Sequence, residues 1–215
     1  MKKGITKILS ACVFAFVVFL AAGTQSKAAV NMGVKQTGAG SSYVDLAWNA
    51  QLGAGHYHTQ FSQDGKNWID MEYSSSPSDS VYNLTQGASY YARVVAYNGS
   101  HYSGTHVMVG VSETAIVSTK PTEVTGLTQT AAGVNSVSMS WNASAGAASY
   151  VIYGYINYNW TQIGTSATNS ATITGVAATT STKFSVAAVK NVTGGTVTGD
   201  QCSGVEMTWS RSRSA

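Results

Sequence analysis

Residues 84–98 read LTQGASYYARVVAYN, and this stretch decides the fold. From Tyr90 onward, apolar side chains occupy every second position through Ala92, Val94 and Ala96. In an extended strand such side chains share one face, so we expect this face to point into a core. Gly87 lies in the segment before the strand and indicates a turn there.

The same alternation recurs along the chain in short runs separated by Gly, Asn, Asp and Ser. Examples are Val44-x-Leu46-x-Trp48 and Val137-x-Met139-x-Trp141. Charged residues make up only 10% of the chain, and helix-favouring windows rich in Glu, Lys and Leu are missing. We therefore predict an all-β protein built from many half-buried antiparallel strands.

The runs repeat once, at a spacing typical of a whole small β domain. Trp48-Asn49-Ala50 recurs as Trp141-Asn142-Ala143, 93 residues later. The pairs Tyr57 and Tyr150, Trp68 and Trp160, Leu84 and Val176, and Ala96 and Ala188 continue the repeat at spacings of 93 or 92. We expect domain 1 at residues 30–119 and domain 2 at residues 120–215, joined by a short segment that contains Pro121.

Residues 84–98 also resemble the signature of the fibronectin type III family. Its features are a Leu, a turn with Gly, a corner Tyr and a Val-x-Ala-x-Asn strand. The resemblance implies two seven-stranded sandwiches with sheets ABE and C′CFG, and it implies almost nothing about chemistry. Thr182 replaces the corner Tyr in the second copy, so we expect domain 2 to be the less stable half. The residues expected to have structural roles are Trp48, Trp68, Leu84, Tyr90, Trp141 and Trp160.

The first 28 residues are typical of a cleaved export signal. A start rich in Lys precedes an apolar run that is short for a membrane span, and Ala28 follows small residues. Four of the twelve cations lie within the first 27 residues, so the formal net charge of +3 falls to −1 after cleavage. This removes most of the case for nucleic acid or an anionic membrane as a partner, and no transmembrane segment is expected in the mature chain.

Catalysis is not expected, because the sequence contains no known catalytic motif. The closest carboxylates, Asp70 and Glu72, fit a solvated edge strand whose charges discourage pairing with another sheet edge. We expect no enzyme activity and no cofactor.

Four histidines are clustered in the sequence of domain 1. His56 and His58 flank Tyr57, and His101 and His106 follow in the F–G loop. If Tyr57 points into the core, both flanking imidazoles share the outer face of strand C, at the end where that loop emerges. The four could ligate zinc, nickel or copper. The alternative is that the four histidines are exposed polar residues that bind no metal.

Several tyrosines are not explained as core residues. Tyr153 and Tyr155 alternate out of phase with Tyr150, and Tyr97 and Tyr102 flank the F–G loop of domain 1. Exposed rings among Asn, Ser and Thr suit sugar faces or a protein interface. The alternative is that these rings pack against cross-strand neighbours on a partly exposed sheet.

These observations predict a secreted or cell-surface module for binding or adhesion, with a polysaccharide or a cell-surface protein as its partner. A structural spacer or assembly subunit, with possible self-association, is the alternative. Cys202, the only cysteine after the signal, is expected to be a buried thiol rather than an intermolecular disulfide.

Overall fold

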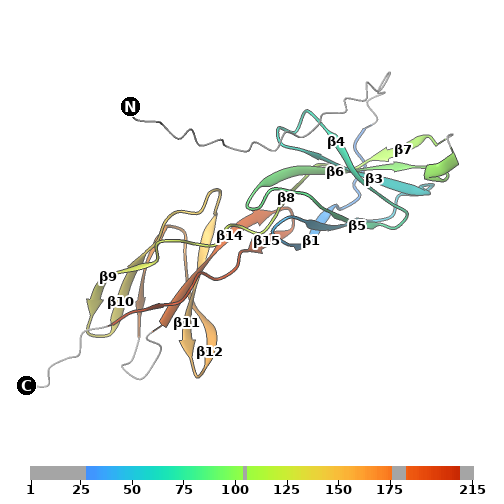
Figure 1. Ribbon diagram of the computed structural model, residues 1–215. Helices are drawn as coiled ribbons and strands as arrows, with labels where there is room; N and C mark the ends of the chain where they lie inside the picture. Colours follow the sequence, from blue (N-terminus) through green and yellow to red (C-terminus); the bar gives the residue numbers. More distant parts are fainter. Residues whose placement is uncertain (1–27, 104–105, 176–182, 209–215) are drawn as a thin grey trace, which may run out of the picture.

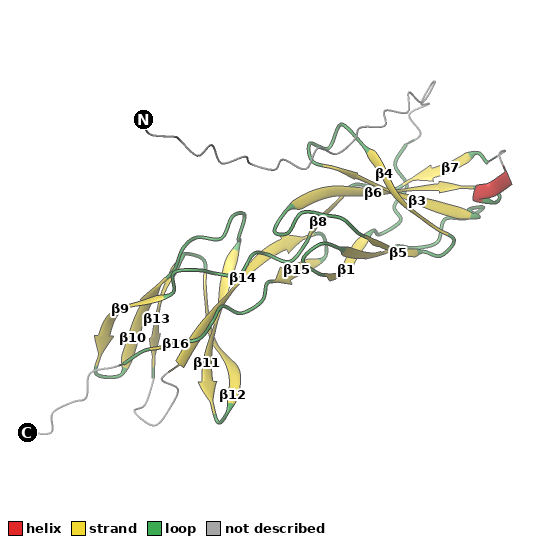
Figure 2. Cartoon of the chain, viewed as in Figure 1, coloured by secondary structure: helices red, strands yellow, loops and turns green. Residues whose placement is uncertain are grey.

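The computed structural model describes residues 28–103, 106–175 and 183–208. The predicted signal at 1–28 therefore lies almost wholly outside the described residues, as do Val176 and Thr182 of the second copy. The described chain is built of β-strands with one short 3-10 helix, η1 (His101–Ser103), and contains no α-helix (Figure 2). This confirms the prediction of an all-β fold.

The first sandwich consists of two antiparallel sheets. One has the order β1-β2-β5, and the other has the order β4-β3-β6-β7, with β8 also paired to β6. The strands are β1 (Lys35–Ala39), β2 (Val44–Ala47), β3 (His56–Ser62), β4 (Ile69–Ser74), β5 (Ser78–Val81), β6 (Ser89–Tyr97), β7 (Met108–Val111) and β8 (Ala115–Ser118). In sandwich notation these sheets are ABE and C′CFG, with strand G split in two, as the family resemblance implied.

The second sandwich has the same strand order. Its sheets run β13-β10-β9 and β12-β11-β14-β15, with β16 paired to β14. The strands are β9 (Thr128–Gly133), β10 (Ser136–Ser140), β11 (Ser149–Ile156), β12 (Asn159–Ser166), β13 (Ser170–Thr174), β14 (Lys183–Val192), β15 (Gly195–Thr198) and β16 (Val205–Glu206). β12 and β4 are edge strands in equivalent positions.

The repeat seen in the sequence is also present in the packing of the two cores. Trp48 contacts Tyr57 edge to face at 5.4 Å between ring centroids, and Trp141 contacts Tyr150 in the same way at 5.2 Å. Both tyrosine hydroxyls accept a backbone N–H from the residue six positions earlier in the chain. Each tryptophan belongs to a separate cluster of buried side chains, so each sandwich has its own core.

The corner tyrosine is present in the first sandwich. Tyr90 is buried, and its hydroxyl accepts a hydrogen bond from the backbone N–H of Thr85 at 3.0 Å. This bond fixes the turn that precedes β6, and Leu84 packs into the same core. The alternation of Tyr90, Ala92, Val94 and Ala96 does point inward, as the opening stretch predicted.

Two of the residues assigned structural roles lie outside the cores. Trp68 precedes β4 and is half-buried beneath the Arg93 guanidinium, which lies 4.1 Å from its ring centroid. Trp160 lies on edge strand β12 and is 36% exposed. Both rings therefore lie on the outer face of a C′C pair rather than in a core.

The two sandwiches lie end to end (Figure 1). Several bonds cross the joint between them. The Ile116 N–H donates to Thr193 Oγ1 at 2.7 Å, and Lys190 donates to the Gly87 carbonyl. Lys120, at the start of the second domain, contacts Asp200 of the same domain at 2.7 Å. Ser118 and Thr119 are fully buried, so the connection is a packed segment rather than a solvated linker.

Candidate functional site

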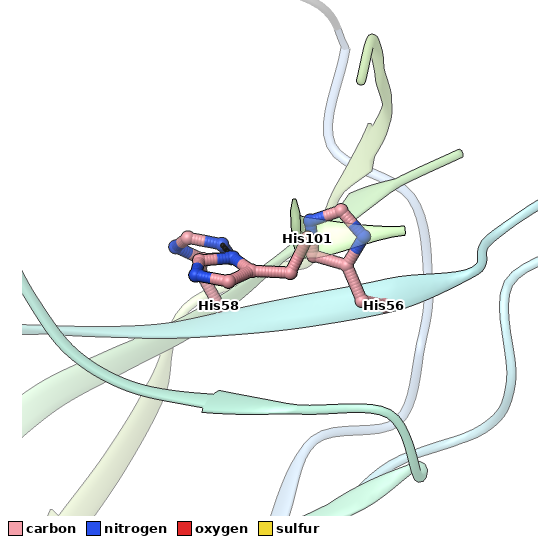
Figure 3. Close-up of side chains that lie close together, drawn as sticks. All are labelled: His56, His58 and His101. Atoms are coloured by element: carbon pink, nitrogen blue, oxygen red, sulfur yellow. Dashed lines mark hydrogen bonds between the residues drawn. The ribbon is translucent and has the colours of Figure 1, made fainter. Parts of the chain in front are cut away.

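The four histidines lie close together on one face of the first sandwich. His56 and His58 project from β3 on the side opposite Tyr57, which points into the core. η1 follows β6 and brings His101 over the same face, where Figure 3 shows the three rings gathered on one side of the strand. One nitrogen from each of His56, His58 and His101 lies within 4.8 Å of the other two. Side chains 45 residues apart in sequence therefore form one cluster.

His106 borders this cluster. Its ring centroid lies 5.1 Å from that of His56 and 6.4 Å from that of His101. Tyr97 stacks on His56, with centroids 5.3 Å apart and planes 11° from parallel. Tyr97 is thus half-buried among imidazoles rather than presented to solvent. Tyr102 is 85% exposed beside His101.

Burial favours the neutral imidazole of His58. His58 is partly buried, and burial is the main cause that lowers its pKa. Asp70, whose carboxylate lies 4.0 Å from His58 Nδ1, opposes the shift, while the neighbouring histidines add to it. Neutral imidazole is the form that binds zinc, copper or nickel.

A second candidate surface lies at the tip of the β11–β12 hairpin in the other sandwich. Tyr155 pairs with Trp160 across the ladder, and their rings meet edge to face at 5.3 Å. A two-residue turn, Asn157-Tyr158, joins the strands with both residues at positive φ, and Tyr158 is 90% exposed. We call Tyr155, Tyr158 and Trp160 the aromatic tip. Tyr153 lies two residues before Tyr155 on the same strand face and is half-buried.

Trp160 rests against backbone on one side. A Cβ added to Gly204 would lie 2.6 Å from the Trp160 ring, so only glycine allows this approach. Trp160 was expected to have a structural role, and Tyr158 was not among the expected binding residues. The signal that could have found Tyr158 is Asn157, because Asn favours the first position of a two-residue hairpin turn.

Cys202 is buried, which confirms the sequence prediction. Its backbone N–H donates to Val186, and its carbonyl accepts from Ser185 Oγ. The thiol is buried against β14, where its sulfur accepts the Val186 N–H at 3.3 Å.

The strand order decides the fold. Both halves have sheets ABE and C′CFG, and the first half has the corner tyrosine bonded to the preceding turn. The chain has the fold of two tandem fibronectin type III domains. It resembles chitinase A1 of Niallia circulans, with 33% identity over 162 residues, which is 72% of this chain and 22% of the relative. The chain therefore spans less than a quarter of the curated relative it matches.

Solved structures with this fold also align with the chain. A two-domain fibronectin type III segment of chicken tenascin is 14% identical, covers 81% of this chain and 97% of its own, and has a TM-score of 0.38. The FN1–FN3 domains of chicken CNTN1 are 14% identical over 85% of this chain and 68% of theirs, with a TM-score of 0.45. No family model matches this chain. Within residues 28–103, 106–175 and 183–208, no helix has the length and apolar character needed to cross a membrane.

Proposed function

We propose that this tandem fibronectin type III protein is a non-catalytic extracellular binding module that holds a neutral polysaccharide on its aromatic tip. The observation that carries the proposal is Tyr158, a 90% exposed aromatic side chain at a φ of 64°. The second position of such a turn favours Gly, because a Cβ is unfavourable at positive φ. Tyr158 therefore costs folding energy and buries little of its surface.

Backbone strain of this kind is concentrated at functional sites, where contacts made outside the fold compensate for it. Tyr155 and Trp160 stand on the two strands next to the turn, 39% and 36% exposed. Three aromatic rings are thus gathered at one end of a hairpin. Each ring offers a flat apolar face, and the tyrosine hydroxyls and indole N–H add polar groups.

The charge of the hairpin favours an uncharged partner. No Asp, Glu, Lys, Arg or His occurs between Glu123 and Lys183, so β11 and β12 contain no ionisable acid or base of these types. Lys183, which approaches the tip at Gly204, stands opposite Glu206 in the β14–β16 ladder. Gln162, which stands opposite Tyr153 in the ladder, shares the strand face of Tyr155 and Trp160, and its amide matches the hydroxyls of a sugar.

The relative gives independent support. Chitinase A1 is named for action on a polysaccharide, and its match to this chain is consistent with a module that works in the same surroundings. An extracellular location fits both that relative and the predicted export signal.

A non-catalytic role fits the carboxylates of the chain. Asp70 and Glu72 lie on edge strand β4, where both are exposed, and Asp70 accepts a hydrogen bond from Gln60 Nε2 at 2.8 Å. A general acid usually needs a pKa raised by burial. An open, solvated pair does not provide that burial.

The test is retention of the mature chain on insoluble polysaccharides, with chitin and cellulose as the probes. Tyr155→Ala should weaken retention about tenfold, the loss expected for about 1.4 kcal/mol of ring contact. Tyr91→Ala is the matched control, because Tyr91 is also 39% exposed but lies in the first sandwich.

Equal retention of the wild type and Tyr155→Ala would refute the proposal. A wild type retained on neither chitin nor cellulose would also refute it. Self-association of that wild type in sedimentation would then favour an assembly subunit. Edge strand β12, which carries no charge to prevent pairing, would be the place to look for that contact.

A further inference from the structure

The protonation of His56 is set by its surroundings. Its Nδ1 lies 3.1 Å from the carbonyl oxygen of Gly99. A carbonyl can only accept, so Nδ1 carries a proton, and in the neutral ring Nε2 then presents a lone pair. The residue is 0% exposed, and Nε2 has no hydrogen-bond partner among the described residues.

A buried acceptor without a partner is costly, so its presence needs an explanation. Histidines that ligate metals typically donate one ring N–H to a carbonyl, which orients the other nitrogen toward the ion. His56 has this arrangement, with the Gly99 carbonyl as the orienting acceptor. Its free nitrogen belongs to a ring that lies among three other imidazoles.

The spacing of the next two histidines also fits ligation. His58 Nε2 and His101 Nδ1 are 3.2 Å apart. Two nitrogens bound tetrahedrally to one ion at about 2.1 Å would lie about 3.4 Å apart. The third nitrogen, from His56, lies within 4.8 Å of both, so small side-chain rotations would complete the set.

We propose that His56, His58 and His101 hold one divalent transition-metal ion of the zinc and copper class, with His106 in reach as a fourth ligand. His106 Nδ1 is likewise buried and without a partner among the described residues. Imidazole ligands favour this class over calcium and magnesium, which prefer oxygen. Asp70 Oδ1 lies 4.0 Å from His58 Nδ1, beyond hydrogen-bond range but on the side where a carboxylate could orient that ligand after a small movement.

The ion would connect two elements of the first sandwich. His56 and His58 belong to β3, whereas His101 belongs to η1, between β6 and β7. Binding would therefore hold the F–G loop against strand C and stabilise domain 1. This site is independent of the polysaccharide proposal, because the aromatic tip lies in the other sandwich.

The first measurement is metal content of the untagged chain after equilibrium dialysis against zinc or copper, with magnesium and calcium as comparison ions. We expect one zinc or copper per chain and neither comparison ion. At a free zinc concentration 100 times the dissociation constant, the melting temperature of domain 1 should rise by about 10 °C. A chain that neither retains zinc or copper nor shifts its melting temperature would overturn the proposal.

His101→Ala and His58→Ala are the informative variants, because neither side chain belongs to the core cluster. Loss of either ligand should weaken binding about 100-fold or more. Tyr102→Ala is the control, since it removes an exposed ring next to His101 and should leave binding unchanged. Undiminished binding by His101→Ala would refute the site.

The tautomer of His56 provides a readout that needs no metal. Nitrogen chemical shifts of the imidazoles in the metal-free chain should show a protonated Nδ1 and a bare Nε2 for His56. A proton on Nε2 would remove the lone pair on which the proposal depends, and would refute it even if the chain bound metal elsewhere.

Discussion

Replacing Tyr158 by Gly should stabilise the second sandwich while it weakens polysaccharide binding. A residue with a Cβ in the left-handed region costs about 1–2 kcal/mol. Gly removes that cost but loses about 0.5–1 kcal/mol of its own through extra freedom in the unfolded chain. Tyr158 is 90% exposed, so little buried area is lost with the ring. The net gain is about 0.5–1 kcal/mol, or about 3–6 °C in the melting temperature of a domain of this size.

Tyr158→Ala separates the two effects, because it removes the ring and keeps a Cβ at the same φ. Calorimetry of the wild type and both variants should show a higher melting temperature for Gly alone. Retention on polysaccharide should fall equally for Gly and Ala, since both lack the ring. A Gly variant less stable than the wild type would refute the assignment of strain, and a Gly variant that binds as well as the wild type would refute the role of the ring.

Three further predictions concern stability. Tyr90→Phe leaves the Thr85 N–H without its acceptor and should cost domain 1 about 1 kcal/mol, measured by urea unfolding. Burial raises the pKa of Glu113, but hydrogen bonds from backbone N–H groups, Met32 and Val34 among them, outweigh it and hold the pKa below its ordinary 4.5. The stabilisation by Glu113 is therefore present above pH 4.5 and is lost as pH falls through the pKa of the folded state. Glu113→Gln should reduce the loss of domain 1 stability at acid pH, and an unchanged dependence of stability on pH would contradict this. Lys190→Met removes the donor to the Gly87 carbonyl across the joint and should separate the melting transitions of the two sandwiches in calorimetry, whereas coincident transitions would show that the bond does not couple them.

The sequence determined the fold because strands such as β2 and β10 alternate strictly between buried and less buried residues. Alternation from Tyr90 to Ala96 predicted an inward-facing strand, and the repeat at about 92 residues predicted a second sandwich with the same strand order. The core pair of Trp48 and Tyr57 recurs as Trp141 and Tyr150 with almost the same geometry. Local pattern suffices here, since side chains in a strand alternate strictly between two faces.

The same rule explains where the sequence prediction failed for particular side chains. Alternation says which residues share a face, but not whether other parts of the chain cover that face. Trp160 was therefore assigned a structural role from its recurrence alone, and the pattern did not show that it lies on the outer face of an edge strand, 36% exposed. Tyr97 was expected at the surface, although His56 and His106 pack against it.

The sequence alone thus determined two all-β sandwiches, the inward faces of their strands and the grouping of four histidines in one half of the chain. Only the tertiary structure decided that His56 is fully buried with an unpaired nitrogen, and that Tyr158 extends from a strained turn. Both facts depend on how loops fold back on the sheets and on single φ angles, and neither is encoded in the periodicity of side chains along a strand.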